Sequence, residues 1–316
     1  MTMIVLGLDG GGSKTRVMVA DEQGQEIVTV EGGPSAVRPG QAESSAEVIA
    51  ALVADALAAA DMSHVTPKVL CAGVAGVGRE PERQALWQLL AARELAEEVV
   101  VHADATVALD DAFGDGPGVL LVSGTGSVAF GRSPAGTFAR CGGWGAAIGD
   151  EGSGAWIGRR ALSVVTAASD GREPETALVG AVLTAAQLDD VTELVAWAAR
   201  ATPATLATLA RVVLSVADAG DLRANAIVSI AVEELALHVR TLARRLFVDE
   251  RAALPVALAG GLLGRGTLLR KRLEHRLRGA VPGAQVRAED VVPARGAVRG
   301  ALRFLGEGME QSEPIR

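Results

Sequence analysis

The sequence contains little cysteine. Cys71 and Cys141 are the only two among 316 residues. Two cysteines are too few for a disulfide framework, and their separation does not match the ligand spacing of a zinc site. We therefore expect neither a disulfide-rich secreted domain nor a structural zinc, and we expect a reducing, cytoplasmic environment.

Basic runs and long apolar runs are also missing. The formal net charge is -8, and lysine and arginine are scattered. Because nucleic acid and anionic membranes are bound by clustered positive charge, neither is expected as a partner. The longest alanine- and leucine-rich stretch, residues 48–60, is interrupted by Asp55, and the first residues carry neither a charged start nor a cleavage motif. We expect no membrane-spanning segment and no export signal.

Hydrophobic residues and glycine are abundant. A hydrophobic fraction of 49% over 316 residues allows a substantial core and suggests two domains. Three short clusters of glycine, at residues 10–12, 124–126 and 260–261, are candidate sites.

The first glycine cluster joins two apolar runs, residues 3–8 and 16–20. This pattern predicts a hairpin whose tip binds phosphate, because Gly10–Gly12 let several N–H groups converge and Ser13–Thr15 add further donors. Asp9 precedes the tip. A carboxylate beside phosphate is repulsive unless a cation lies between them, so we expect Asp9 to face hydrated Mg²⁺. A glycine turn without a ligand remains the alternative.

Two other nucleotide-binding loops are excluded at this place. A P-loop has glycine directly before its lysine and another glycine five residues earlier, where this chain has Ser13 and Leu8. A dinucleotide fingerprint continues into a helix, but residues 16–20 are short and rich in valine. The same objection removes the match formed by Gly124, Gly126 and Ala129, because a strand again follows it.

The order of elements predicts an α/β fold. Three antiparallel strands followed by alternating helices and strands describe a mixed-sheet domain of the ribonuclease-H type, and a degenerate second copy follows. We expect residues 1–114 with about 290–316, including a closing C-terminal helix, to form one domain, and residues 115–289, with a helical insertion, the other. The expected strands are residues 3–8, 16–20, 26–31, 69–72, 98–102, 118–122, 128–131, 137–141, 255–259 and 284–287. The expected helices include residues 83–95, 105–113, 153–168, 173–187, 191–200, 203–218, 222–248, 266–278 and 294–305.

The three glycine clusters and two further segments carry a family resemblance. The loop after Asp9, the loop at residues 123–127 and the Ala-Gly-Gly turn at residues 259–261 resemble, in this order, the phosphate and adenosine motifs of the actin, Hsp70 and sugar-kinase superfamily. His-Ala-Asp-Ala-Thr at residues 102–106 and the glycine-rich segment 141–153 resemble the N-acetylglucosamine kinases and the BadF/BadG/BcrA/BcrD group. The resemblance implies two ribonuclease-H-like (actin-like ATPase) domains with an interdomain nucleotide and sugar cleft. It also implies an ATP- and Mg²⁺-dependent kinase that acts on the 6-hydroxyl of N-acetylglucosamine, glucosamine or N-acetylmuramic acid.

The resemblance assigns roles to individual residues. Asp104 would be the general base, although it could instead cap the helix that follows it. Asp9 would reach Mg²⁺ through water. The expected ATP-binding residues are Gly11, Gly12, Ser13, Lys14, Thr15, Gly124, Thr125, Gly126, Ser127, Gly260 and Gly261. The expected sugar-binding residues are Ser35, Ala36, Asp104, Gly143, Trp144, Gly145 and Asp150.

Several points stay open in the sequence. Ala36 stands where the acetylglucosamine kinases carry an asparagine, which leaves the preferred sugar undecided. Trp144 could pack between the domains, and the role of Glu151 is not assigned. Asp110 and Asp111 are expected to be exposed charges at a helix end.

Two other functions compete with the kinase. The same group includes activators that couple ATP hydrolysis to electron transfer through an iron–sulfur cluster shared by two subunits, which would need the two cysteines of each chain. An ATP-gated binding protein of the Hsp70 or actin kind would use the loops as a conformational switch. A homodimer is also expected.

Overall fold

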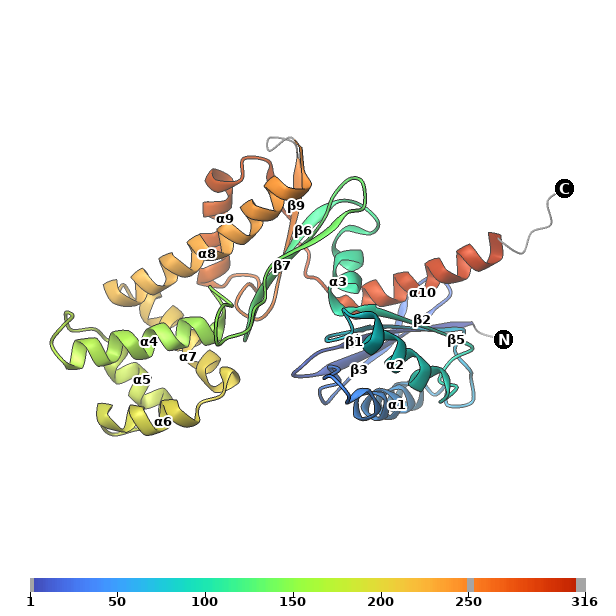
Figure 1. Ribbon diagram of the computed structural model, residues 1–316, viewed down its shortest axis with the longest axis horizontal. Coiled ribbons are helices and arrows are strands. Elements are labelled where there is room, and N and C mark those ends of the chain that lie inside the picture. Colours follow the sequence, from blue (N-terminus) through green and yellow to red (C-terminus); the bar gives the residue numbers. More distant parts are fainter. Residues whose placement is uncertain (1–2, 249–252, 311–316) are drawn as a thin grey trace. The chain divides into compact units, whose positions relative to one another are not determined.

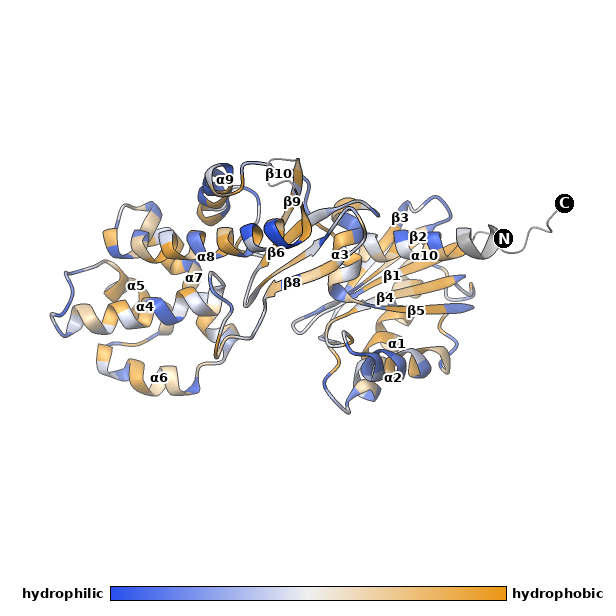
Figure 2. Ribbon diagram, turned by 45° about the horizontal axis from the view of Figure 1, so that its top comes forward, coloured by the Kyte–Doolittle hydropathy of each residue, from blue (hydrophilic) through white to orange (hydrophobic). Residues whose placement is uncertain are grey.

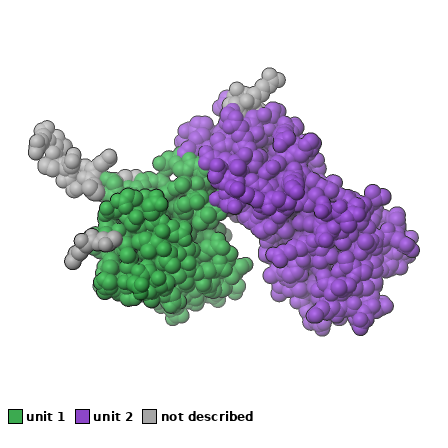
Figure 3. Space-filling view, turned by 180° about the vertical axis from the view of Figure 1, so that it is seen from behind, with its two compact units in different colours: residues 1–115, 291–316 green, residues 116–290 purple. Residues whose placement is uncertain are grey.

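The computed structural model describes residues 3–248 and 253–310, with side chains as far as residue 306. The chain divides into two compact units, Met1–Asp115 with Val291–Arg316 and Gly116–Asp290 (Figure 3). Among the described residues, no helix combines the length and apolar character needed to cross a membrane.

Unit 1 is built on a mixed sheet (Figure 1) with the strand order β3-β2-β1-β4-β5 (Figure 2). β1 pairs antiparallel with β2 and parallel with β4, and β4 pairs parallel with β5. β1 and β4 are almost wholly apolar and buried (Figure 2), as expected where helices cover both faces. The strands are β1 Ile4–Gly10, β2 Thr15–Asp21, β3 Glu26–Gly32, β4 Val69–Val74 and β5 Glu98–Ala103.

Alternate residues of β1 face two different core clusters. Ile4, Leu6 and Leu8 join a cluster with α1 and α2. Val5 joins a second cluster with α3 and α10. The C-terminal helix therefore covers the face of the sheet opposite α1. The helices are α1 Ala42–Ala59, α2 Glu80–Ala91, α3 Asp104–Phe113 and α10 Pro293–Glu310.

Glycine permits the close contact of α10 with the sheet and with α3. A Cβ at Gly7 would lie 2.2 Å from the carbonyl oxygen of Ala294, and one at Gly296 would lie 1.9 Å from that of Val107. Neither distance is possible for a real side chain. Backbone thus packs directly on backbone at these two points.

The expectation that Asp110 and Asp111 are exposed is wrong. Both side chains are buried. Asp111 accepts hydrogen bonds from Nε and Nη2 of Arg295 at 2.6 and 2.8 Å and from the amide of Val292 at 2.7 Å. Asp110 accepts one from Arg303 at 3.1 Å. These buried carboxylates join α3 to α10, because arginines recurring every four residues lie on one face of that helix.

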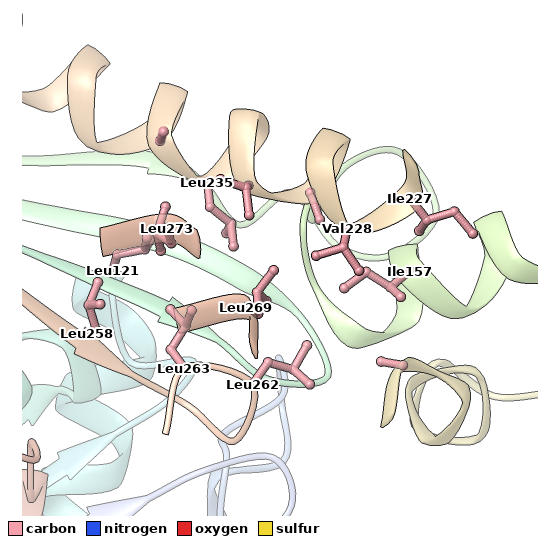
Figure 4. Packing of buried hydrophobic residues seen from close by; sticks show 14 of the residues in the cluster. Leu121, Ile157, Ile227, Val228, Leu235, Leu258, Leu262, Leu263, Leu269 and Leu273 are labelled. Atoms are coloured by element: carbon pink, nitrogen blue, oxygen red, sulfur yellow. The ribbon is translucent and has the colours of Figure 1, made fainter. Parts of the chain in front are cut away.

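Unit 2 repeats the mixed sheet with the order β10-β9-β6-β7-β8. Residues of its strands and of the helices packed on them form one continuous hydrophobic core (Figure 4). The strands are β6 Gly118–Ser123, β7 Ser127–Arg132, β8 Phe138–Gly142, β9 Leu254–Ala259 and β10 Ala284–Val286. The helices are α4 Gly154–Ser169, α5 Leu178–Ala186, α6 Leu194–Arg200, α7 Pro203–Asp218, α8 Leu222–Leu246 and α9 Leu268–Ala280, with a 3₁₀ turn, η1, at Val191–Glu193.

The predicted α/β fold is confirmed, while several helix boundaries differ from the prediction, those of α5 and α2 among them. α5 begins at Leu178 instead of residue 173, because the Asp221 carboxylate accepts hydrogen bonds from the hydroxyl of Thr176 and the amide of Ala177. α2 begins at Glu80 and ends at Ala91, and Glu94 beyond it has a φ of 50° that no α-helix can contain.

Candidate active site

Two carboxyl groups lie at the carboxyl ends of the parallel strands in unit 1. The register places Asp9 of β1 beside Gly73 of β4 and Gly73 beside His102 of β5, and Asp104 follows two residues later as the first residue of α3. Ligands of open α/β sheets gather at this end of the strands. Burial, and after it the charge of Asp104, raise the pKa of Asp9 to about 6 against the opposing effects of Arg16 and Lys14. The two predicted acidic residues are therefore brought together.

Asp104 has the environment of a base more than that of a helix cap. Burial raises its pKa, and the amides of Ala105 and of Asp104 itself oppose the shift. The N-cap position of α3 belongs to Ala103, which has no side-chain acceptor. Asp104 still accepts a 2.9 Å hydrogen bond from the amide of Ala105, so it also helps to satisfy the start of the helix.

The tip between β1 and β2 offers free backbone donors. The amide of Gly11 donates to the carbonyl of Lys14 at 2.9 Å, which closes the turn. Within the described part of the chain, the amides of Gly12 and Ser13 make no hydrogen bond. Lys14 forms a 3.0 Å ion pair with Glu31, and both side chains are half exposed. Such a surface pair stabilises weakly, so Lys14 can exchange Glu31 for an anionic ligand at little cost.

Thr15 and Ser35 use their hydroxyl groups inside unit 1. Thr15 Oγ1 lies 2.7 Å from Ser35 Oγ and 2.7 Å from the carbonyl oxygen of Gly33. Ser35 Oγ fills the space that a side chain at Gly10 would need. The amides of Ser35 and Ala36 donate to the carbonyl of Gly11 at 3.1 and 3.2 Å, so this loop is fastened to the phosphate turn.

The second glycine loop, residues 123–127, joins β6 to β7 in front of α4. The carbonyls of Gly124 and Thr125 accept hydrogen bonds from the first two amides of α4 at 2.8 and 3.2 Å. The amides of Thr125 and Gly126 have no partner among the described residues. The positive end of the α4 dipole thus lies directly behind two free donors, an arrangement that favours an anion.

The third glycine turn lies against the second loop. Gly260 has a φ of 91°, and a Cβ there would be 2.3 Å from the carbonyl oxygen of Ser123. The same carbonyl accepts a hydrogen bond from the amide of Leu262 at 3.2 Å. Gly261 beside it has open space where a side chain would be. The two predicted ATP motifs of unit 2 therefore form one surface.

The glycine-rich segment 141–153 is also fastened to the second loop. Gly143 and Gly145 have positive φ angles of 71° and 90°, and Asp150 has one of 59°. The buried Asp150 accepts a 3.0 Å hydrogen bond from the amide of Gly145 through Oδ1, and its Oδ2 would lie 2.6 Å from a Cβ at Gly126. Ser127 Oγ donates to the carbonyl of Glu151 at 2.7 Å. The sequence did not predict these contacts between segment 141–153 and the second loop, although a serine on each side of the Gly-Thr-Gly tip was a possible signal.

Trp144 is not part of the core of unit 2. Its side chain is 67% exposed, and the Arg140 guanidinium lies 5.0 Å from the ring centroid. The indole is thus held by a cation–π contact. An exposed, fixed aromatic ring can serve as an apolar wall for a ligand.

Known proteins are similar to this chain over most of its length. The chain is 31% identical over 261 residues to the N-acetylmuramic acid/N-acetylglucosamine kinase of Clostridium acetobutylicum, covering 82% of this chain and 85% of that one. It is 29% identical to the N-acetyl-D-glucosamine kinase of Dictyostelium discoideum, covering 95% and 98%. A crystal structure from Chromobacterium violaceum, named as a candidate N-acetylglucosamine kinase, matches with a TM-score of 0.75 at 31% identity over 94% of this chain and 98% of that one.

These similarities confirm the predicted actin-like ATPase fold. The family model of the BadF/BadG/BcrA/BcrD ATPases matches residues 6–301, from β1 to α10. The chain therefore belongs to the BadF/BadG/BcrA/BcrD ATPase family, as the resemblance of its motifs predicted.

Proposed function

We propose that the protein is an ATP-dependent sugar kinase that phosphorylates the 6-hydroxyl of an amino sugar, N-acetylglucosamine or a close relative such as glucosamine or N-acetylmuramic acid. The observation that carries the proposal is the pair of carboxyl groups, Asp9 and Asp104, at the carboxyl ends of the parallel strands of unit 1. The names of the two kinases from Clostridium acetobutylicum and Dictyostelium discoideum support the substrate class.

Asp104 is the proposed general base. Its raised pKa makes the carboxylate a stronger proton acceptor than an exposed aspartate. It takes the proton of the sugar 6-hydroxyl as that oxygen bonds to the γ-phosphorus of ATP. The bond from the γ-phosphorus to the bridging oxygen breaks, and ADP leaves with that electron pair. The products are ADP and a sugar 6-phosphate.

Free amides in both units are proposed to hold the phosphates of one ATP. Gly12 and Ser13 supply them in unit 1, Thr125 and Gly126 in unit 2, and Lys14 adds a positive charge. Gly11 and the hydroxyl of Thr15 are engaged within the fold, so they shape the turn instead of donating. The adenine would lie against Gly261, where no side chain intervenes.

The residues near Asp9 suit Mg²⁺ bound mainly by nucleotide and water. Burial and the charge of Asp104 disfavour ionised Asp9 when no cation is present, and a divalent cation would remove this penalty. Within the described residues, no group of three histidine, cysteine or acidic side chains could form a protein-only metal cage. Mg²⁺ commonly takes only one or two carboxylates beside phosphate oxygens and water. It would neutralise charge that develops on the phosphates.

The sugar is proposed to meet Asp104 and the segment that contains Trp144 and Asp150. The exposed indole would provide an apolar wall, and backbone groups at Gly143 would bind hydroxyls, while the amide and carbonyl of Gly145 are engaged within the loop and shape it. Ala36 has no polar side-chain group that could bind the acetamido substituent, so it does not define the preferred sugar. A coupled assay with ATP identifies that sugar from a panel of N-acetylglucosamine, glucosamine, N-acetylmuramic acid, N-acetylmannosamine and glucose.

The central test is Asp104→Asn. We expect kcat to fall by about 10²–10⁴-fold, the usual contribution of a positioned base, while affinity for the ATP analogue AMP-PNP is retained. A coupled assay of ADP release with the preferred sugar measures the first, and calorimetry the second. Asp55→Asn, on the exposed side of α1, is the matched control and should keep full activity. Unchanged sugar phosphorylation by Asp104→Asn would remove the base assignment.

The redox-activator alternative needs accessible thiolates. Cys71 lies in the buried core of β4, and burial raises its pKa to about 12. Burial also raises the pKa of Cys141, which is partly buried. Cluster ligation requires deprotonated cysteines at a shared surface, so these positions favour the kinase.

A further inference from the structure

A groove of about 460 Å³ lies in unit 2 between α9 and the edge strand β10. None of its lining residues belongs to the second or third glycine loop, residues 123–127 and 259–261. Its charged lining consists of Arg265, Arg270, Lys271, Glu274, Arg278 and Arg287. Five of these six side chains are cationic, in a chain whose net charge is -8.

Two of these cations have no acidic partner. Glu274 is engaged by Arg270, whose Nε lies 2.7 Å from Oε1, so it does not neutralise the others. Within the described residues, Lys271 and Arg278 form no ion pair. By contrast, Arg276 on the same helix binds Glu233 outside the groove. Arg272, also outside the groove, donates to Oδ1 of Asn225, so Lys271 and Arg278 are the cations of α9 that remain for a ligand of the groove.

Helical geometry places the two cations along one wall. Residues seven apart in an α-helix share a face and lie about 10 Å apart along its axis. Lys271 and Arg278 stand in this relation, and Leu277 of α9 and Val286 of β10 add apolar surface to the lining. Such a lining suits a ligand with an anionic group and a less polar body.

The wall is fixed by a buried arginine. Arg270 is 5% exposed, and its guanidinium donates to the carbonyls of Leu263 at 3.2 Å and Arg287 at 3.0 Å. These bonds join the loop after β9 to the chain that leaves β10. Because each guanidinium nitrogen of Arg270 donates a hydrogen bond within the fold, this residue holds the groove open instead of binding the ligand, and preorganised sites lose less entropy on binding.

We propose that this groove binds a small phosphomonoester anion, with Lys271 and Arg278 as its phosphate contacts. A phosphomonoester carries close to two negative charges near neutral pH, which two unpaired cations can match. The volume falls in the range of small-molecule pockets, about 300–1,000 Å³. The acidic net charge of the chain argues against a polyanion such as nucleic acid. The site does not depend on the kinase assignment.

The test is calorimetry on the full chain with glycerol 3-phosphate and inorganic phosphate as probes and glycerol as the uncharged control. Saturating AMP-PNP and Mg²⁺ are present throughout to occupy the nucleotide loops. The double variant K271Q/R278Q should bind both probes at least about tenfold more weakly, because two charge-assisted contacts are lost. Both side chains end at the surface, so the fold should survive the change.

The control R200Q/R211Q removes the same charge from exposed positions on α6 and α7 and should bind as the unaltered chain does. Equal losses in both double variants would mean that net charge alone attracts the probes and would overturn the proposal. So would failure of the unaltered chain to bind at millimolar concentration. Binding of the probes that appears only in a parallel titration without AMP-PNP would also overturn it, since the groove would then belong to the nucleotide site.

Discussion

At the scale of the residue, Asp9 is where stability and proposed function conflict. Its carboxyl group is buried near Asp104, and its pKa of about 6 lies above the ordinary value of 3.8. The unfolded chain releases this proton more readily than the folded chain. Below pH 3.8 the buried carboxyl group therefore costs the folded state no electrostatic energy. The free energy of unfolding falls as the pH rises from 3.8 through 6.

Asp9→Asn should remove this penalty from the ligand-free protein. We expect the variant to exceed the unaltered chain in unfolding free energy by about 1–3 kcal/mol near neutral pH, a gain that shrinks toward pH 4. The same variant should lose Mg²⁺-dependent activity. Urea unfolding at several pH values without Mg²⁺ measures the first effect. A gain that is constant with pH would show that Asp9 does not titrate as described, and Asp55→Asn should give no gain.

Ala36 is the residue most open to a change of specificity. Its backbone is held by a hydrogen bond from its amide to the carbonyl of Gly11, and the hydroxyl of the neighbouring Ser35 is hydrogen-bonded to that of Thr15. The Ala36 side chain is itself partly exposed, so a larger group can be accommodated.

Ala36→Asn should raise the preference for N-acetylglucosamine over glucosamine, by roughly tenfold in the ratio of kcat/KM, because an amide can hydrogen-bond the acetamido group. Ala36→Leu has a similar side-chain volume without the amide and is the matched control. If the leucine variant gained the same preference, packing and not hydrogen bonding would decide the choice of sugar.

At the scale of the element, sequence patterns predicted most strands and helices but not what joins them. α7 has the predicted bounds because Thr202 caps it and Pro203 begins it, both local signals. The burial of Asp110 and Asp111 could not be read locally, since their arginine partners on α10 are more than 180 residues away. The stripe Arg295, Arg299 and Arg303 was visible in the sequence, but nothing there identified the carboxylates it binds. The proposed phosphate loops were predicted because glycine and hydroxyl residues cluster in the sequence, whereas the contact of Asp150 with Gly126 depends on folding.

The packing of α10 gives an element-scale prediction. Gly296→Ala should destabilise unit 1 by about 2–3 kcal/mol, because a Cβ 1.9 Å from the carbonyl oxygen of Val107 forces α10 away from α3. Gly306→Ala, on an exposed and open part of the same helix, should instead stabilise by about 0.5–1 kcal/mol. Urea denaturation compares the two. If the two substitutions changed the free energy of unfolding equally, the close packing described for α10 would be contradicted.

At the scale of the whole molecule, the proposed reaction needs one nucleotide to be shared by both units. Each unit presents a glycine turn with amides that make no hydrogen bond among the described residues, Gly12 and Ser13 in one and Thr125 and Gly126 in the other. A triphosphate has more acceptor oxygens than either turn can satisfy alone. The two turns therefore become a single nucleotide site only if they act on the same ligand.

Calorimetric stoichiometry distinguishes a shared nucleotide from two separate ones. We expect one AMP-PNP per chain, and both Lys14→Met in unit 1 and Thr125→Pro in unit 2 should weaken that single event, each by about tenfold or more, because each removes a donor to the same phosphates. Gly261 is open, so Gly261→Ala should weaken it through the adenine end without changing the stoichiometry. Two independent sites would behave differently: two nucleotides would bind, and each variant would abolish one event and leave the other at its original affinity. That second result would end the kinase proposal, since phosphoryl transfer beside Asp104 requires the phosphates gripped by unit 2 to reach the carboxyl groups of unit 1.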